Sequence, residues 1–288
     1  MTTDKVTISS GRGDLPTATL THDGGASCEV VLSGAHITSW KTPDGVERLF
    51  VSSASGFGRG IAIRGGIPVC FPQFSGRGPL SKHGFARTST EWEIAEMSSD
   101  ADMTRLVLSL RNSEASRAVW PHSFELRYSV TLTGDSLAMD MHLSNTGDDV
   151  LDFTAALHTY FAVPDVGSIR IHGLSGLSYE DNAAAGAISR EEAEEVAIVG
   201  EVDRVYLDAP EQVKLLIPTQ GTVKIAKSGG FRDVVVWNLG EQKAPEMADL
   251  GEGEWRHYVC IEAGAIGEKV TVAPGECFAA SQRFDMAS

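Results

Sequence analysis

The sequence predicts an all-β protein, a large antiparallel sandwich or barrel with few short helices. The first observation is an alternation of apolar residues with a period of two in consecutive segments. These residues are Leu126, Tyr128, Val130 and Leu132, followed by Leu137, Met139, Met141 and Leu143. The turn at residues 133–136 lies between them, so the pattern predicts a β-hairpin with one buried face.

The second observation is the number of similar short segments, each bounded by Gly, Pro, Asn or Asp. They lie at residues 28–32, 92–97, 106–110, 213–217, 223–226, 233–237, 257–261, 269–272 and 278–284. Many strands at close spacing are typical of sandwiches and barrels.

One helix is expected at residues 189–196, where Ser189 and Glu192 fit a capping box and the acidic run is expected to face solvent. Two Gly-rich stretches, residues 52–90 and 173–205, are predicted as functional loops. No repeat or Pro-rich linker marks a boundary, so residues 1–288 are predicted to form a single domain.

The composition restricts the class of partner. A hydrophobic fraction of 42% and a charged fraction of 22% are typical of globular proteins with a sizeable core. The formal net charge of −15 disfavours nucleic acid and anionic membrane surfaces, which need clustered Lys and Arg. A small anionic ligand stays compatible with this charge, because a few convergent arginines can reverse the potential inside a cleft.

The cysteines and the N-terminal segment indicate a cytoplasmic protein. Cys28, Cys70, Cys260 and Cys277 lack CxxC spacing, which favours free thiols over a zinc or redox site. The first five residues contain no apolar stretch, and no run is long enough to cross a bilayer, so neither export nor membrane insertion is expected.

A short segment of this acidic chain gathers cations in a Gly- and Pro-rich context. Arg64 precedes two glycines, and Lys82, His83 and Arg87 follow shortly after. Such loops can present cations to an anionic ligand. The alternative interpretation is that Arg64 and Arg87 form structural ion pairs with carboxylates.

Two further residues are candidates for acid–base chemistry. His158 lies among apolar strand formers, where a single histidine is more often a core residue than a catalyst. Glu262 is predicted at the end of a strand, before a turn at Gly264. The absence of HExxH, GxSxG, Walker and GxGxxG motifs excludes the enzyme classes that these motifs define.

Taken together, several segments closely resemble the glucose-6-phosphate 1-epimerases, the hexose-6-phosphate mutarotases of the aldose 1-epimerase superfamily. The matching segments are RGGIPVCFPQF at 64–74, KHGFAR at 82–87, LHTYF at 157–161, EVDRVY at 201–206, DVVVWN at 233–238 and IEAG at 261–264. The resemblance implies a galactose-mutarotase-like β-sandwich. It also implies that His158 is the general acid and Glu262 the general base. The positions that it assigns to substrate binding are Arg64, Lys82, His83, Arg87 and Asp203.

Two departures from the family pattern concern the site. Ala263 stands where the family commonly has proline, which would loosen the turn expected to hold Glu262, and Lys82 stands where it often has Gln. Residues 159–163 lack the Phe-Asn-Leu ending typical of neutral-sugar mutarotases, which favours the phosphosugar branch. Tyr160, Phe161 and Trp237 are the residues expected to shield the acid–base pair from water.

The implied activity is interconversion of the α and β anomers of D-glucose 6-phosphate without a metal, nucleotide or redox cofactor. The expected partner is a small hexose 6-phosphate, and a monomer is expected. Two alternatives stay open: an aldose 1-epimerase for neutral sugars, and a non-catalytic module that binds or senses a sugar phosphate. A glycosidase is disfavoured because no second carboxylate is clearly placed beside Glu262.

Overall fold

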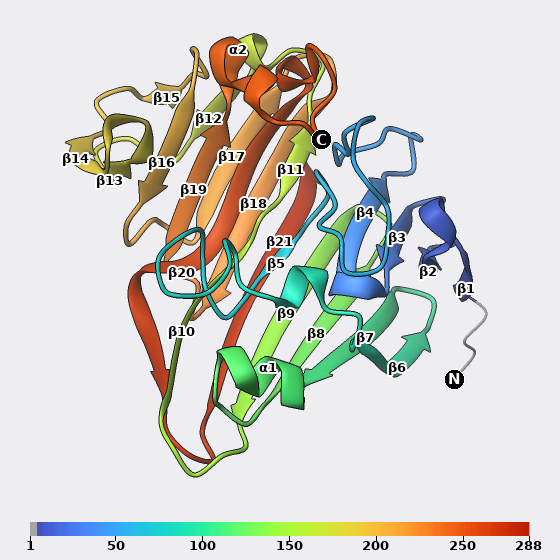
Figure 1. The fold of residues 1–288 in the computed structure, drawn as a ribbon. Coiled ribbons are helices and arrows are strands. Elements are labelled where there is room, and N and C mark those ends of the chain that lie inside the picture. The colour runs from blue at the N-terminus through green and yellow to red at the C-terminus, as the bar shows by residue number, and fades with distance from the viewer. Residues whose placement is uncertain (1–4, 288) are drawn as a thin grey trace.

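The computed structural model describes residues 5–287. Residues 1–4 and 288, which include most of the segment examined above for a signal sequence, lie outside the described residues. Within residues 5–287, the named strands form three antiparallel sheets, connected by loops and short helices (Figure 1). The predicted all-β class is confirmed.

The largest sheet has nine strands in the order β15-β12-β17-β18-β21-β9-β8-β7-β6. Their bounds are β6 Glu93–Ser99, β7 Thr104–Arg111, β8 Phe124–Leu132, β9 Ser136–Asn145, β12 Arg170–His172, β15 Glu195–Val196, β17 Gln212–Ile217, β18 Gly221–Gly229 and β21 Cys277–Ala287.

The second sheet has eight strands, in the order β14-β13-β16-β19-β20-β10-β5, and β11 also pairs with β20. Their bounds are β5 Val69–Cys70, β10 Leu151–Leu157, β11 Tyr160–Ala162, β13 Ser178–Asp181, β14 Ala187–Arg190, β16 Val202–Tyr206, β19 Asp233–Asn238 and β20 Tyr258–Val272. This sheet carries the candidate site described below.

The third sheet is the N-terminal meander β1-β2-β3-β4, at Val6–Ser10, Pro16–Thr21, Ser27–Val31 and His36–Lys41. The described residues contain two α-helices, α1 at Glu114–Val119 and α2 at Gly240–Lys243. Their other helical turns are 3₁₀, among them η3 at Ala86–Thr88, η6 at Ala244–Glu246 and η7 at Glu254–His257. No helix within residues 5–287 is long and apolar enough to cross a membrane.

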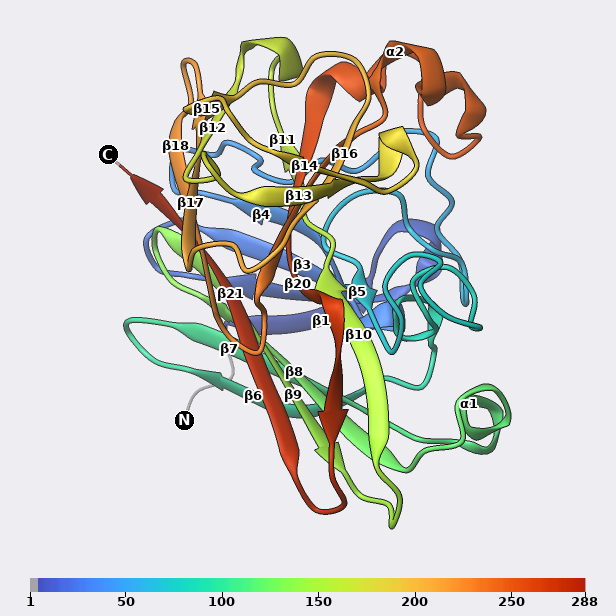
Figure 2. The same cartoon turned by 90° about the vertical axis from the view of Figure 1, so that its left-hand side faces the viewer.

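The core lies between the two large sheets, which appear as separate layers in Figure 2. Phe153 of β10 packs edge-on against Phe278 of β21, with ring centroids 5.1 Å apart. Phe161 of β11 meets Phe284 of β21 in the same way at 4.9 Å. Aromatic pairs of this kind add to the stabilisation from apolar burial. The two layers are therefore a sandwich rather than a barrel.

The predicted hairpin is confirmed. Strands β8 and β9 pair over their whole length, and Leu126 lies opposite Leu143. All eight alternating apolar residues are at most 1% exposed. The alternation was a reliable signal because one face of this hairpin packs against the core.

The predicted helix at residues 189–196 is wrong, because β14 and β15 occupy this segment. The acidic run is also not wholly solvent-facing. Glu191 is buried and accepts hydrogen bonds from Arg204 at 2.8 Å and from the Tyr206 hydroxyl at 2.7 Å. These tertiary contacts override the local helical pattern. Residues 173–205, predicted as a loop, in fact contain four strands, whereas residues 52–90 are largely irregular.

Candidate active site

One row of side chains crosses the exposed face of the eight-stranded sheet. Tyr160 of β11 is opposite Cys260 of β20, Cys260 is opposite Trp237 of β19, and Trp237 is opposite Asp203 of β16. Residues directly opposite each other in neighbouring strands point to the same face of a sheet. The register therefore places these four side chains on the face that points away from the main core.

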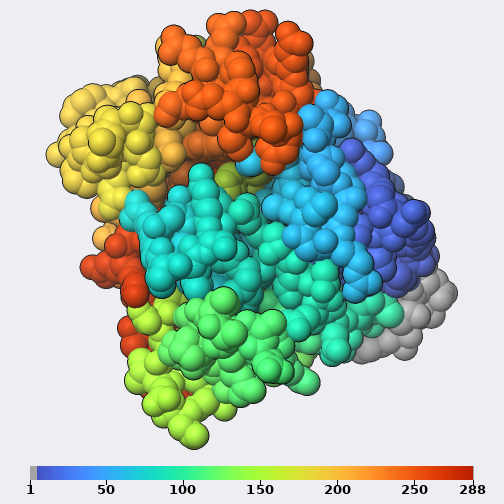
Figure 3. All heavy atoms as spheres, in the orientation of Figure 1, coloured from blue at the N-terminus to red at the C-terminus, as the bar shows by residue number. Residues whose placement is uncertain are grey.

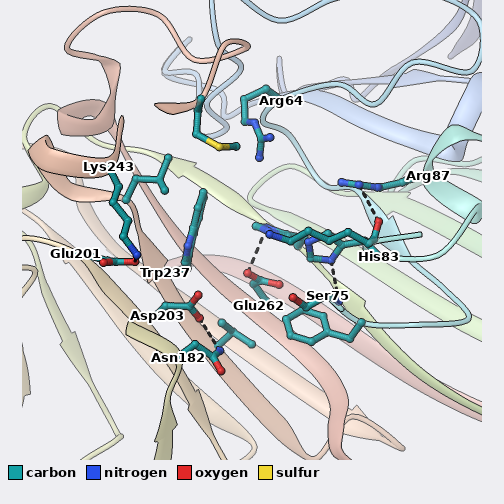
Figure 4. Close-up of a pocket in the computed structure, with 16 residues that line it drawn as sticks. Arg64, Ser75, His83, Arg87, Asn182, Glu201, Asp203, Trp237, Lys243 and Glu262 are labelled. Carbon is teal, nitrogen blue, oxygen red and sulfur yellow. Dashed lines mark hydrogen bonds and ion pairs between the residues drawn. The ribbon is translucent and has the colours of Figure 1, made fainter. Parts of the chain in front are cut away.

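A cavity of about 460 Å³ lies over this face (Figure 4). Its mouth is a recess between the segment at residues 240–250 and the loops of residues 50–90 (Figure 3). The lining residues are Arg64, Phe74, Ser75, Lys82, His83, Arg87, His158, Asn182, Glu201, Asp203, Val235, Trp237, Leu239, Lys243, Met247 and Glu262. The structure thus brings together all seven residues that the resemblance assigned to the site.

His158 lies where a strand is interrupted. Strands β10 and β11 pair with different parts of β20, and His158 and Thr159 connect them. The Thr159 N–H donates to the Leu157 carbonyl at 3.0 Å, which makes a three-residue turn centred on His158. From the core side, the Thr159 hydroxyl donates to Gln282 of the opposite sheet at 3.1 Å. This turn directs the imidazole into the cavity.

Aromatic rings fix the orientation of the His158 imidazole. The Tyr160 ring stacks on it almost parallel, with centroids 4.8 Å apart. The rings of Trp237 and His83 meet it edge-on, at 5.7 Å and 5.3 Å. Tyr160 and Trp237 therefore shield the site as expected. Phe161 does not, because successive strand residues alternate between faces and its side chain lies in the core.

Glu262 is not at a strand end, as the sequence had suggested. It lies within the 15-residue strand β20 and is 1% exposed. The next residue, Ala263, pairs with Leu157 on one side and Val234 on the other. No turn follows Glu262, so the expectation that Ala263 loosens such a turn is also wrong. Two neighbouring strands hold this part of the backbone.

The His158 and Glu262 side chains meet at the floor of the cavity, although the residues are far apart in sequence. His158 Nδ1 lies 3.2 Å from Glu262 Oε1. The two groups are not aligned as a hydrogen bond, and both Nδ1 and Oε2 lack a hydrogen-bond partner among the described residues. Catalytic hydrogen bonds are often poorly aligned until a substrate binds.

Burial disfavours charge on both members of this pair. It raises the pKa of Glu262 well above its ordinary value, with a further increase from the nearby Asp203 carboxylate. Burial also lowers the pKa of His158 well below its ordinary value, and the His83, Arg64 and Arg87 side chains add to this effect. Both shifts favour a single proton on the pair.

Arg64 has a carboxylate partner, as one of the two sequence interpretations proposed. Its guanidinium donates to both oxygens of Asp249, at 3.1 and 3.0 Å, and to the Tyr160 hydroxyl at 2.9 Å. Its side chain is 18% exposed. Arg64 consequently links the loops of residues 50–90 to the segment that covers the top of the cavity.

The two glycines after Arg64 are required by close backbone approaches. Gly65 and Gly66 have φ values of +116° and +63°, which other residues rarely adopt. A Cβ atom on Gly66 would lie 2.1 Å from the Ile37 carbonyl oxygen, and one on Gly65 would lie 2.3 Å from the Phe50 carbonyl oxygen. The glycines allow the arginine loop to lie against β4 and the neighbouring backbone.

Arg87 has no carboxylate partner among residues 5–287. Its Nη2 donates to the Lys82 carbonyl at 2.9 Å, and its buried Nε makes no hydrogen bond to a described residue. Figure 4 shows its guanidinium at the cavity edge opposite Trp237 and Asp203. Lys82 is exposed beside it, and its charge partly offsets the burial that raises the pKa of both Asp203 and Glu262. These two cations form an unpaired positive edge.

His83 is a fixed hydrogen-bond donor. The Ser75 N–H donates to its Nδ1 at 3.3 Å, and the Cys70 thiol lies 3.2 Å from the same nitrogen. Burial and the neighbouring cations lower the pKa of His83 to about 3, so the ring is neutral. Because Nδ1 accepts, the ring proton is on Nε2. His83 therefore lines the cavity as a neutral donor.

Asp203 lies on the side of the cavity opposite Arg87. Asn182 donates to its Oδ1 at 2.8 Å, and burial raises the pKa of this carboxyl above its ordinary value. Asn182 was not among the predicted site residues, nor were Glu201 and Lys243, which form an ion pair at 2.8 Å on the same side. Glu201 begins the EVDRVY segment quoted above, whereas no sequence motif marks Asn182 or Lys243, which only the fold brings to the site.

A two-layer antiparallel sandwich with a buried His–Glu contact in a polar cavity on one sheet is the architecture of a mutarotase-type epimerase. A family model described as aldose 1-epimerase matches residues 16–285, and the chain belongs to this family. It is 37% identical over 263 residues to a Cenchrus ciliaris protein named "Putative glucose-6-phosphate 1-epimerase", covering 88% of this chain and 80% of that one.

Two further relatives agree with this assignment. An Escherichia coli K12 protein with the same name is 33% identical over 247 residues, covering 83% of this chain and 81% of its own length. The crystal structure of a Salmonella typhimurium protein described as "a putative mutarotase" superposes with a TM-score of 0.90 at 25% identity. It covers 100% of this chain and 95% of that one. The galactose-mutarotase-like fold expected from the motifs is thus confirmed.

Proposed function

We propose that this epimerase interconverts the α and β anomers of D-glucose 6-phosphate and related hexose 6-phosphates, as a glucose-6-phosphate 1-epimerase. The observation that carries the proposal is the contact of His158 with Glu262 in a cavity whose edge holds the unpaired Arg87. The names of the relatives from Cenchrus ciliaris and Escherichia coli support the same substrate class.

Anomerisation begins by opening a cyclic hemiacetal. A base removes the proton of the C1 hydroxyl while an acid protonates the ring oxygen, and the bond between C1 and that oxygen breaks. Both oxygens are bonded to C1, so the acid and the base must lie side by side. The 3.2 Å contact of His158 Nδ1 with Glu262 Oε1 meets this requirement. We assign Glu262 as the base and His158 as the acid, so the single proton of the pair must be on His158 when the ring opens.

Ring closure reverses the two roles. After rotation about the bond between C1 and C2, His158 takes back the proton of the C5 hydroxyl as its oxygen attacks the other face of the aldehyde. Glu262 then protonates the new C1 oxygen. The pair carries one proton before and after both ring opening and ring closure. Burial favours this same number of protons on the pair.

The remaining lining residues suit the rest of the sugar phosphate. A guanidinium and an ammonium at the cavity edge, Arg87 and Lys82, match a phosphate dianion. On the other side, Asp203 and the neutral His83 offer an acceptor and a donor to sugar hydroxyls. Arg64 is the third candidate for the phosphate, but any anion there competes with Asp249.

The test is the rate of α-to-β exchange, measured by NMR exchange spectroscopy on glucose 6-phosphate, other hexose 6-phosphates, glucose and galactose. We expect exchange well above the spontaneous rate for the phosphorylated hexoses and much slower exchange for the neutral sugars. Faster exchange of galactose or glucose would favour the neutral-sugar alternative. Tight binding of glucose 6-phosphate without exchange would establish a binding module instead.

The pKa shifts also predict the pH dependence of kcat. The pair becomes doubly protonated only below the pKa of His158, which burial lowers well below the ordinary value of 6.5. We therefore expect kcat at saturating substrate not to decline as the pH falls from neutrality to about 6.5, and to decline only at lower pH. The measurement uses kcat because a phosphate monoester itself titrates at a pH of about 6. A midpoint at or above pH 6.5 would contradict the assignment of the pair.

A further inference from the structure

Cys260 is a buried thiol behind the cavity lining, on the strand that carries Glu262, and the proposed reaction gives it no role. It is 0% exposed and lies two residues before Glu262 on β20, so the two side chains point to the same face of the sheet. One donor atom each from His158, Cys260 and Glu262 can be chosen so that all three lie within 4.8 Å of one another. The residues come from two segments far apart in the sequence.

Two atoms of this cluster have unsatisfied hydrogen-bonding capacity. His158 Nδ1 and Glu262 Oε2 are buried and make no hydrogen bond to a described residue. Buried polar atoms are normally paired, so two such atoms side by side need a ligand to satisfy them. A cation would accept both lone pairs at once.

We propose that His158, Cys260 and Glu262 form a binding site for a thiophilic divalent cation, and that Zn²⁺ occupying it inhibits the enzyme. Zinc takes imidazole nitrogen, thiolate sulfur and carboxylate oxygen at about 2.0–2.3 Å in a tetrahedron, with the donors about 3.5 Å apart. The present cluster reaches that geometry if side-chain rotations bring the donors about 1 Å closer together.

The ligand set also selects the ion and leaves it accessible. A thiolate ligand favours Zn²⁺ over Mg²⁺ and Ca²⁺, which prefer oxygen. Because His158 and Glu262 line the cavity, an ion held by these two residues would border the space proposed for the substrate. Three protein ligands and one open position are the pattern of accessible zinc sites rather than closed structural ones.

Inhibition follows from which lone pairs the ion occupies, and this half of the inference rests on the proposed function. Zinc bound to Nδ1 of His158 and to the Glu262 carboxylate removes the acid and the base together. Binding also displaces the proton of the Cys260 thiol to solvent.

The experiment measures metal binding and turnover separately on the metal-free enzyme. Equilibrium dialysis gives the zinc stoichiometry, and Co²⁺ reports a thiolate ligand through a charge-transfer absorption in the near ultraviolet. We expect one ion per chain, a cobalt–thiolate band, and a loss of anomer exchange of about tenfold or more at saturating zinc that EDTA reverses.

Cys260→Ala provides the decisive comparison, with Cys28→Ala as a control because Cys28 is a buried thiol in the core far from the cluster. The Cys260 variant should keep its basal turnover and lose the cobalt–thiolate band. Its affinity for zinc should fall by at least about a hundredfold. Cys260→Ser, which keeps the side-chain volume, repeats the comparison if the alanine variant does not fold.

Three results would overturn the inference. These are equal zinc affinity in the Cys260 and Cys28 variants, a cobalt complex of the wild type without a thiolate band, and full turnover with zinc bound. If the wild-type enzyme shows no anomer exchange on any sugar, the proposed function fails, while dialysis and the cobalt spectrum still decide the metal site.

Discussion

Replacing Glu262 with Gln is expected to lower kcat for anomer exchange by at least about a hundredfold, because positioned acid–base groups contribute about 10² to 10⁴ in rate. The amide keeps the shape and burial of the side chain but can neither take nor return the C1 hydroxyl proton. His158→Ala should have an effect of the same order, since the two groups share one proton. Near-normal exchange in either variant would refute the assignment.

The substitution Glu262→Gln should not destabilise the fold. Burial raises the pKa of Glu262 above its unfolded value of about 4.5. Above that value, unfolding releases the proton that the folded protein retains, so stability falls as the pH rises. Gln has no such dependence. The melting temperature of Glu262→Gln should therefore equal or exceed that of the wild type, and the difference should grow from about pH 5 to about pH 8.

Glu191→Gln is the matched control, because it makes the same change from carboxylate to amide at another buried glutamate. Glu191 is 7% exposed but lies outside the cavity, paired with Arg204 and Tyr206. We expect this variant to lose about 1–3 kcal/mol of unfolding free energy and to keep kcat. Opposite effects of the two variants on stability and turnover would separate catalysis from structural support.

The second large effect concerns Arg87. Replacing it with Ala should raise KM for glucose 6-phosphate by about tenfold to a hundredfold, because hydrogen bonds to charged groups contribute about 1.5–3 kcal/mol. KM for free glucose should hardly change. Arg64→Ala should have a smaller specific effect, since Asp249 already neutralises that guanidinium.

Steady-state kinetics on the two sugars test this prediction. Arg111→Ala is the control, because Arg111 is exposed and pairs with Glu125 far from the cavity lining. An equal rise of KM for glucose and glucose 6-phosphate in Arg87→Ala would show that Arg87 supports the loop rather than the phosphate. The ratio of KM for glucose 6-phosphate to KM for glucose in Arg87→Ala therefore decides whether Arg87 binds the phosphate or has a structural role.

The sequence predicted the parts of the fold that depend on local pattern. The hairpin of β8 and β9 followed from its alternation, because a half-buried strand repeats every two residues. The helix predicted at residues 189–196 is wrong for the complementary reason. Its helical pattern is local, whereas the burial of Glu191 against Arg204 depends on strands that only the fold brings together.

The candidate site likewise combines features that the sequence predicted with features that only the fold shows. Residue patterns alone favoured a core position for His158 and a turn for Glu262, and only the family motifs connected them. Their contact depends on the register of β20 with β10 and β11 across two interruptions, which no short segment encodes. Asp249, the partner of Arg64, was not foreseen either, because ion pairs between distant loops leave no local signal.

Asp249 is a tethered competitor for any anion that binds at Arg64. A carboxylate held on the same chain acts at a high effective concentration. Inorganic phosphate or chloride, which brings no other contacts, has to displace it unaided. A sugar phosphate that also engages Asp203 and His83 gains enough binding energy elsewhere to do so. We therefore expect Arg64 to reject small anions and to accept a phosphate only when it is attached to a hexose.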